Sequence, residues 1–136
     1  MVAVGEIALL MVLVAQDWNQ WHRDLADFTR SPTEHEIIIL EHPFVVRSVA
    51  GVIILGPDSH GPLAAVLFEI EGPGTVRRIR RANTDLRGQF RITHVHPGTY
   101  RFKTTLAGFK SVAGTIIVSK KADPRGRIRI DTEVGN

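Results

Sequence analysis

From residue 44 to the end of the chain, short apolar runs alternate with clusters of turn-forming residues. The intervening segments, such as 56–62 and 83–88, are rich in glycine, proline, asparagine and aspartate, which favour turns. Helical periodicity is missing from this part of the sequence. About seven strands joined by short polar turns predict an all-β fold, a seven-stranded antiparallel β-sandwich. The predicted strands span residues 44–55, 64–71, 76–82, 89–95, 99–106, 111–119 and 127–134.

Alternation within these runs indicates which side chains face the core. The clearest case is the second run, in which Phe68 and Ile70 fall on one face and Glu69 and Glu71 on the other. Successive side chains of a strand point to opposite faces, so the apolar pair is predicted to be buried. Two aromatic side chains of the fifth run are likewise expected to point inward, Tyr100 and Phe102.

Size and composition narrow the class of protein. A chain of 136 residues with 43% hydrophobic content is large enough for one domain with its own core. The absence of cysteine excludes disulfides and thiolate metal sites. The net charge of +3 comes without basic clusters interleaved with aromatic residues, so no nucleic-acid partner is expected.

The first 15 residues differ in kind from the rest. Residues 7–15 are continuously apolar, which is too short to span a bilayer but typical of a signal peptide that is removed before Gln16. Glu6 stands where such peptides usually carry a positive charge. We therefore expect an exported protein, located in the periplasm, the cell envelope or outside the cell. The alternative is that residues 1–28 stay attached as a helical anchor to a membrane or a larger assembly.

Residues 16–43 are expected to form a short N-terminal helix and a lead-in strand, ahead of the sandwich at 44–136. Trp18, Trp21, Leu25 and Phe28 recur at the spacing of one helix face. The two tryptophans could offer a ring platform to a sugar or a protein partner. Their other interpretation is structural, because large aromatic residues commonly anchor a helix on a core.

The sandwich region resembles the carboxypeptidase regulatory-like domain, a family with a transthyretin-like, or prealbumin-like, Greek-key fold. The similarity extends over about Val45 to Val134 and rests on five segments, 49–53, 61–66, 84–92, 97–102 and 108–109. It implies a non-catalytic module of a secreted or cell-envelope protein. It also implies that Tyr100 is a buried tyrosine whose hydroxyl reaches back to a nearby loop.

An arginine-rich segment is the first candidate binding site. Six arginines and one aspartate between residues 77 and 91 give that stretch a net charge of +5, whereas residues 17–41 carry −4. Arginine binds oxyanions bidentately, so phosphates, acidic polysaccharide or an anionic membrane surface are possible ligands. The alternatives are charge matching within the molecule and protection of an edge strand against aggregation. The candidate residues are Arg77, Arg78, Arg80 and Arg81.

His94 and His96 form the second candidate site. In a strand the two imidazoles would share a face, as a metal site or a general base requires. No third ligand is evident nearby, and His42 and His60 could contribute only if the fold brings them close. Exposure on a loop is the competing interpretation. Transthyretin-like hydrolases end in Tyr-Arg-Gly-Ser, which this chain lacks.

The sequence therefore predicts a non-catalytic exported module with a binding or structural role. A glycan or a protein is the expected partner, a membrane only if the N-terminal segment is retained, and no cofactor is expected. The first alternative is a metal-dependent or hydrolase-like enzyme that uses His94 and His96. The second alternative is a membrane-anchored structural subunit.

Overall fold

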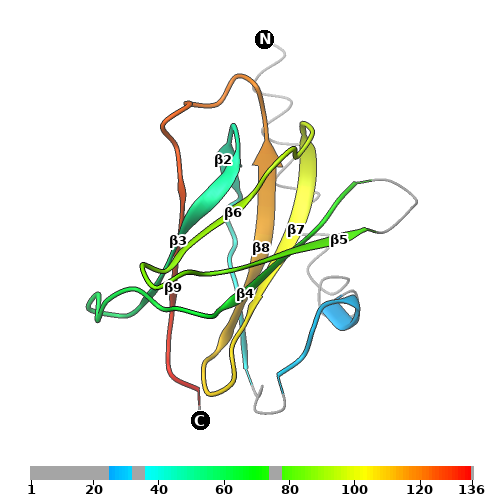
Figure 1. Cartoon of the computed structure of the whole chain (residues 1–136). Coiled ribbons are helices and arrows are strands. Elements are labelled where there is room, and N and C mark those ends of the chain that lie inside the picture. The colour runs from blue at the N-terminus through cyan, green and yellow to red at the C-terminus, as the bar shows by residue number, and fades with distance from the viewer. Residues whose placement is uncertain (1–24, 32–35, 74–77, 136) are drawn as a thin grey trace.

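The computed structural model describes residues 25–31, 36–73 and 78–135, and within these ranges the protein is all-β (Figure 1). The helical element of this part is η1, one turn of 3-10 helix at Leu25–Asp27. The strands of the described residues are β1 (Ile37–Ile39), β2 (Phe44–Val46), β3 (Val49–Leu55), β4 (Leu67–Glu71), β5 (Ile79–Asn83), β6 (Gln89–Ile92), β7 (Gly98–Thr105), β8 (Ser111–Val118) and β9 (Ile128–Thr132).

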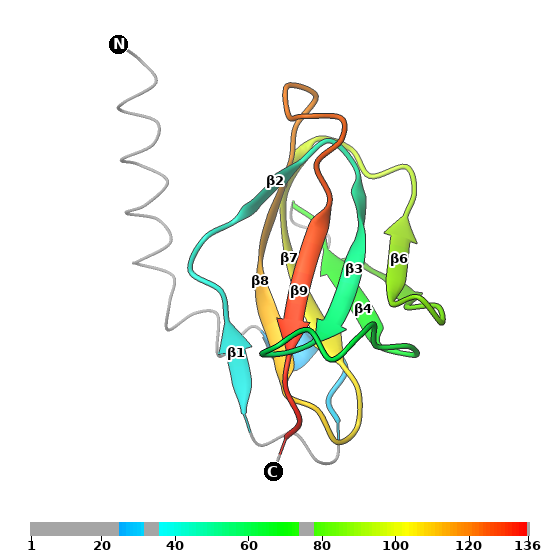
Figure 2. The same ribbon diagram turned by 90° about the vertical axis from the view of Figure 1, so that its left-hand side faces the viewer.

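Two mixed sheets form the body of the molecule (Figure 2). The larger sheet has the order β1-β8-β7-β4-β5, with β2 also paired to β8, and the smaller has the order β6-β3-β9. β1 and β2 run parallel to β8, and β9 runs parallel to β3. The all-β prediction is confirmed. Two details differ. The sheets are mixed rather than purely antiparallel, and the described residues from 44 on form eight strands rather than seven, with β1 before them in the region of the expected lead-in strand.

The predicted strand 44–55 is divided by a bend at Arg47 and Ser48. β2 before the bend pairs with β8 of the larger sheet, whereas β3 after it belongs to the smaller sheet. Val46 and Val49 on either side of the bend are both buried, at 3% and 0% exposure. The chain thus passes from one sheet to the other over the end of the core, which adds a strand to the predicted number.

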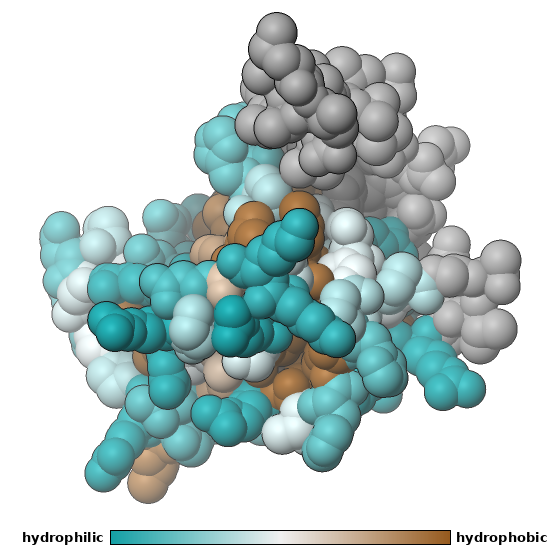
Figure 3. Space-filling view, turned by 90° about the horizontal axis from the view of Figure 1, so that it is seen from above, coloured by the Kyte–Doolittle hydropathy of each residue, from teal (hydrophilic) through white to brown (hydrophobic). Residues whose placement is uncertain are grey.

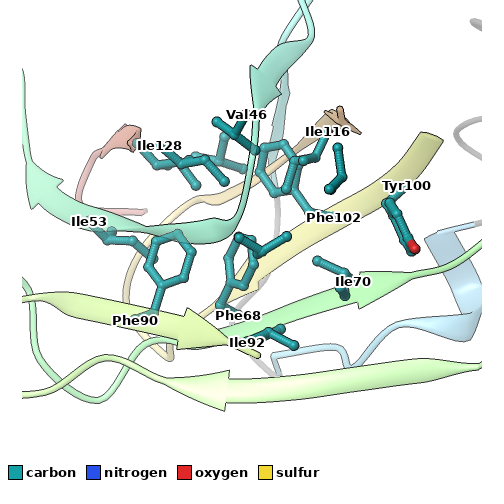
Figure 4. Packing of buried hydrophobic residues seen from close by; sticks show 14 of the residues in the cluster. Val46, Ile53, Phe68, Ile70, Phe90, Ile92, Tyr100, Phe102, Ile116 and Ile128 are labelled. Atoms are coloured by element: carbon teal, nitrogen blue, oxygen red, sulfur yellow. The ribbon is translucent and has the colours of Figure 1, made fainter. Parts of the chain in front are cut away.

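The core lies between the two sheets and contains a row of aromatic rings (Figure 4). Phe68 of β4 stacks on Phe90 of β6, with 4.0 Å between ring centroids, and lies 5.7 Å from Phe102 of β7. Ile70 and Tyr100 are also buried. The inward-facing positions expected from alternation are therefore confirmed.

Residues 25–31, here called the strap, lie against the outer face of the larger sheet, on the side away from that core. Leu25 and Phe28 are buried together with Ala113 of β8, and Ile37 and Ile79 pack against them. The strap thus forms a small second apolar cluster on this outer face. It holds this position partly through hydrogen bonds to charged side chains, described below.

Most of the predicted N-terminal helix and the predicted signal peptide lie outside the described residues, as do Trp18 and Trp21. Among the described residues, η1 is the part of the predicted helix that is helical. Leu25 and Phe28, which belong to the predicted apolar helix face, are both buried. No helix among the described residues is both long and apolar enough to cross a membrane.

Candidate functional site

One end of the sandwich gathers basic side chains from four loops. Four connections lie at this end: the bend 47–48 and the β4–β5, β6–β7 and β8–β9 loops. The strand register shows this, because the strand residues next to these connections are paired with one another: Val49 with Ile92, Glu71 with both Ile79 and Arg101, and Gly98 with Val118. We call it the basic end. Seen from above, long hydrophilic side chains extend across this end, and hydrophobic surface is visible between them (Figure 3). Its described cationic residues in and beside these loops are Arg47, Arg78, Arg80, Arg91, Lys120, Lys121, Arg125 and Arg127.

A pocket of about 480 Å³ opens at this end between the β4–β5 and β6–β7 loops. We call it the arginine cleft. Among the described residues its polar side chains come from two arginines and two histidines, with the hydroxyl of Tyr100, and no acidic side chain lines it. The lining consists of Ile70, Gly72, Pro73, Arg78, Arg80, His94, Val95, His96, Pro97 and Tyr100.

Arg80 reaches the cleft because of its position in the sheet. It lies directly opposite Ile70 in the antiparallel pair β4–β5, and opposed residues point to the same face. The Arg80 guanidinium therefore extends past the edge of the core toward the β6–β7 loop. There it donates hydrogen bonds of 2.6 Å to the carbonyl of Thr93 and 3.2 Å to that of His94.

The β6–β7 loop is held at both ends by such side-chain donors. The Tyr100 hydroxyl donates a 2.6 Å hydrogen bond to the carbonyl of His96, which agrees with the reach toward a nearby loop that the resemblance implied. His94 adopts a left-handed backbone conformation with φ of 58°, which is uncommon outside glycine although histidine tolerates it better than most residues. The two imidazoles are thereby fixed on a short, braced loop.

His94 and His96 are both exposed and lie in the loop that follows β6, which ends at Ile92, so the structure agrees with the interpretation as loop residues and not with alternation in a strand. They nevertheless line the same pocket, together with Arg78 and Arg80. Among the described residues no group of three or more histidine, aspartate or glutamate side chains is arranged to hold a metal ion. The two other histidines of interest, His42 and His60, do not line the cleft.

A second, smaller pocket of about 320 Å³ adjoins the arginine cleft and shares His94 and Val95 with it. We call it the side cleft. Its charged side chain is Arg91 of β6. The rest of its wall comes from Ser48 and Val49, at the bend between β2 and β3, and from Ile92 and Thr93, at the end of β6. Next to Ser48, Arg47 donates a 2.8 Å hydrogen bond to the carbonyl of Lys120, which ties the bend to the β8–β9 loop.

The predicted binding residues are thus only partly brought together. Arg78 and Arg80 line the arginine cleft, whereas Arg77, Trp18 and Trp21 lie outside the described residues. Arg81 points to the opposite face of β5, where its Nε lies 2.8 Å from the Glu69 carboxylate. This pair supports the alternative of charge matching within the molecule for that one arginine.

The Glu69 carboxylate belongs to a buried polar cluster on the outer face of the larger sheet that sequence reasoning missed. Glu69 is fully buried and accepts hydrogen bonds from the Thr29 backbone N–H at 2.9 Å and from the Thr29 hydroxyl at 3.1 Å. Lys103, 1% exposed, donates a 2.8 Å bond to the Thr29 carbonyl, and the Thr105 hydroxyl donates to the same oxygen. The cluster is a structural anchor for the strap.

Comparisons with known proteins leave the family open. No family model matches the chain, and no curated protein matches it. Among solved structures, it is similar to the crystal structure of 3-chlorocatechol 1,2-dioxygenase from Rhodococcus opacus 1CP, with 10% identity, a TM-score of 0.40, and coverage of 100% of this chain and 90% of the other. At that level the similarity supports no inference about this protein.

Proposed function

We propose that this protein is a non-catalytic, exported β-sandwich module that binds an anionic ligand in the arginine cleft. The observation that carries the proposal is the convergence of Arg78, Arg80, His94 and His96 on one pocket whose described lining has no acidic side chain. A cleft of this composition favours a carboxylate or phosphate group, because guanidinium groups form charge-assisted hydrogen bonds with oxyanions. Its volume lies within the roughly 300–1,000 Å³ range of ligand pockets.

We further propose that the module is of the carboxypeptidase regulatory-like type, with transthyretin-like Greek-key topology. The hydrogen bond from the Tyr100 hydroxyl to His96 supports this assignment, as does the packing of two sheets around one core. Export rests on the apolar residues 7–15. Mass spectrometry of the mature protein tests it, because a chain that begins at Gln16 supports export and an intact N-terminus contradicts cleavage.

The test of anion binding is an NMR titration of the full chain with galacturonate and, separately, with inorganic phosphate. We expect amide shift changes centred on residues 93–98. Replacing Arg78 with alanine should weaken binding about tenfold, since it removes one charge-assisted contact. The matched control is Arg87→Ala, which removes the same charge from the exposed turn at the other end of the molecule. Equal losses in both variants, or no shift with either anion, would overturn the proposal.

The enzymatic alternative retains one supporting observation, namely that both imidazoles line the same cleft. A metal-dependent or hydrolase-like reaction would require a divalent cation or a water to be held between them. A thermal shift with Zn²⁺ that is abolished by His94→Ala but retained in His60→Ala would favour this alternative. A shift that is equal in both variants, or missing in the unmodified protein, would count against it.

A further inference from the structure

The geometry points to a more specific ligand than a single small anion: an acidic polysaccharide that crosses the basic end, with one charged sugar in the arginine cleft and a neighbouring one in the side cleft. This inference rests on the proposed function. Its first support is that the two pockets, of about 480 and 320 Å³, share the wall formed by His94 and Val95. Because these two residues line both pockets, the pockets lie next to each other, within reach of one extended ligand.

Each of the two pockets has its own cation and no described acid in its lining. Arg78 and Arg80 serve the arginine cleft, and Arg91 serves the side cleft. Arg91 is exposed and lies opposite Ala50 at the end of the smaller sheet. A polysaccharide with a negative charge on each sugar would therefore contact cations in both pockets at once, whereas its monomer occupies only one. Binding at two linked sites gives the polymer a higher affinity than the monomer.

Further cations lie next to the side cleft. Arg47 is the neighbour of Ser48, and its hydrogen bond to the carbonyl of Lys120 places it beside a loop that carries four further exposed cations, Lys120, Lys121, Arg125 and Arg127. Among the described residues of these loops, the exposed acid is Asp123. The opposite end of the sandwich differs, because its described loops and strand ends carry more acids than bases: Glu36, Asp58, Asp85 and Glu133 against Arg87 and Lys110.

The apolar surface at the basic end suits a sugar chain better than a membrane or a nucleic acid. Of the exposed large hydrophobic residues of the described chain, Leu86 and Val134 lie at the opposite end, and Val45 of β2 lies beside the basic end, two residues before Arg47. One exposed valine among the described residues is a weak apolar anchor for a membrane. Nucleic-acid strands bind by stacking on exposed aromatic rings, and the described residues offer none there. Pro73 and Pro97 instead give the arginine cleft small apolar walls against which the face of a sugar ring can pack.

The experiment compares galacturonate with its linear tetramer by calorimetry on the full chain. We expect the tetramer to bind at least about tenfold more tightly, because its second charged sugar engages the side cleft. Arg91→Ala should reduce tetramer affinity about fivefold to tenfold while leaving monomer affinity within about twofold. Arg78→Ala should weaken both ligands, and Arg87→Ala neither. Dextran sulfate, tested in parallel, shows whether sulfate replaces carboxylate as the recognised group.

The outcomes separate this inference from the proposed function. If monomer and tetramer bind equally and Arg91→Ala changes neither, the arginine cleft binds anions but the polysaccharide inference is wrong. If neither ligand binds, both proposals fail. Anionic phosphatidylglycerol vesicles and a 12-nucleotide single strand of DNA serve as competing polyanions. Equal or tighter binding of either one, with the same loss in Arg91→Ala, would also overturn the inference.

Discussion

In the middle of β4 and β7, the larger sheet buries residues of opposite character on its two faces. Phe68 and Phe102 point inward and are 0% exposed, and Glu69 and Lys103 point outward and are 0% and 1% exposed. Glu69 and Lys103 are also direct cross-strand partners. At these two pairs of positions the two faces are thus equally shielded from water, although the buried side chains are opposite in character.

The two faces are stabilised by different physical effects. The inner face gains free energy from buried apolar area, which requires good packing but no specific pairing. The outer face must compensate for the desolvation of two charges, and it does so through specific hydrogen bonds to all three polar groups of Thr29. Leu25 and Phe28 add apolar burial, worth about 1.5–3 kcal/mol each. We therefore expect the inner face to tolerate changes of shape poorly, and the outer face to tolerate changes of charge poorly.

The largest expected effect is on the inner face. Phe102→Ala should lower the free energy of unfolding by about 3–5 kcal/mol, since it leaves a cavity beside Phe68 and Phe44 in the centre of the core. Urea denaturation of the full chain measures this loss. Phe109→Ala, at a half-buried position near the other end of the molecule, is the matched control and should cost clearly less. A loss below about 1 kcal/mol for Phe102→Ala would show that the inner face is not the main source of stability.

The next effect concerns the outer face. Glu69→Gln preserves shape but removes the charge that accepts hydrogen bonds from Thr29 and Arg81, and should lower the free energy of unfolding by about 2 kcal/mol. The loss is moderated because the Arg81 side chain is 54% exposed and finds water instead. Hydrogen exchange gives the sharper measurement. The Thr29 amide should exchange much faster in the variant, while the amide of Val112, deep in β8, should change far less.

A double replacement tests whether charge or shape matters on that face. Removing one member of a buried charged pair leaves the other without compensation, whereas replacing both by apolar residues of similar size is often neutral or stabilising. Glu69→Met combined with Lys103→Met should therefore be more stable than Glu69→Met alone. If the two changes simply add, the pair contributes through separate contacts and the contrast between the two faces is weaker than we infer.

The contrast also explains what could be predicted from the sequence. Alternation placed Phe68 and Phe102 correctly on the buried face, because the apolar side of a strand is visible in the sequence of that strand alone. The same alternation set Glu69 on the opposite face but gave no sign that this face is covered, since the covering residue, Thr29, lies 40 positions away along the chain. Burial of a polar face depends on such distant contacts, which local patterns do not encode.

The candidate site follows the same rule. The arginine-rich segment and the two histidines were each recognisable as local patterns. Their meeting in one pocket depends on the register that sets Arg80 opposite Ile70 and on the hydrogen bonds from Arg80 to the β6–β7 loop. The division of 44–55 into two strands, which creates the wall of the side cleft at Ser48, likewise depends on tertiary pairing with two different sheets.

The smallest expected effect involves charges that are not enclosed. Lys110 lies 3.0 Å from the Glu36 carboxylate and 3.1 Å from that of Glu133, at the end of the molecule opposite the cleft. Hydrogen bonds that the Lys110 ammonium donates to these two carboxylates raise its pKa above the usual value of 10.5. Because folding raises this pKa, the stabilisation is fully present below pH 10.5 and is lost as the pH rises through the folded-state value.

Lys110→Met removes that contribution, so its Tm should lie below that of the unmodified protein at pH 8 and approach it once the pH has risen through the raised pKa of Lys110. The difference should be much smaller than that of Glu69→Gln, since Glu36 and Glu133 are 68% and 48% exposed and are screened by water and salt. Lys120→Met, which removes the same charge from the β8–β9 loop, is the control and should show no such convergence. A Lys110→Met effect as large as that of Glu69→Gln would mean that enclosure by the strap is not what makes the outer-face charges important.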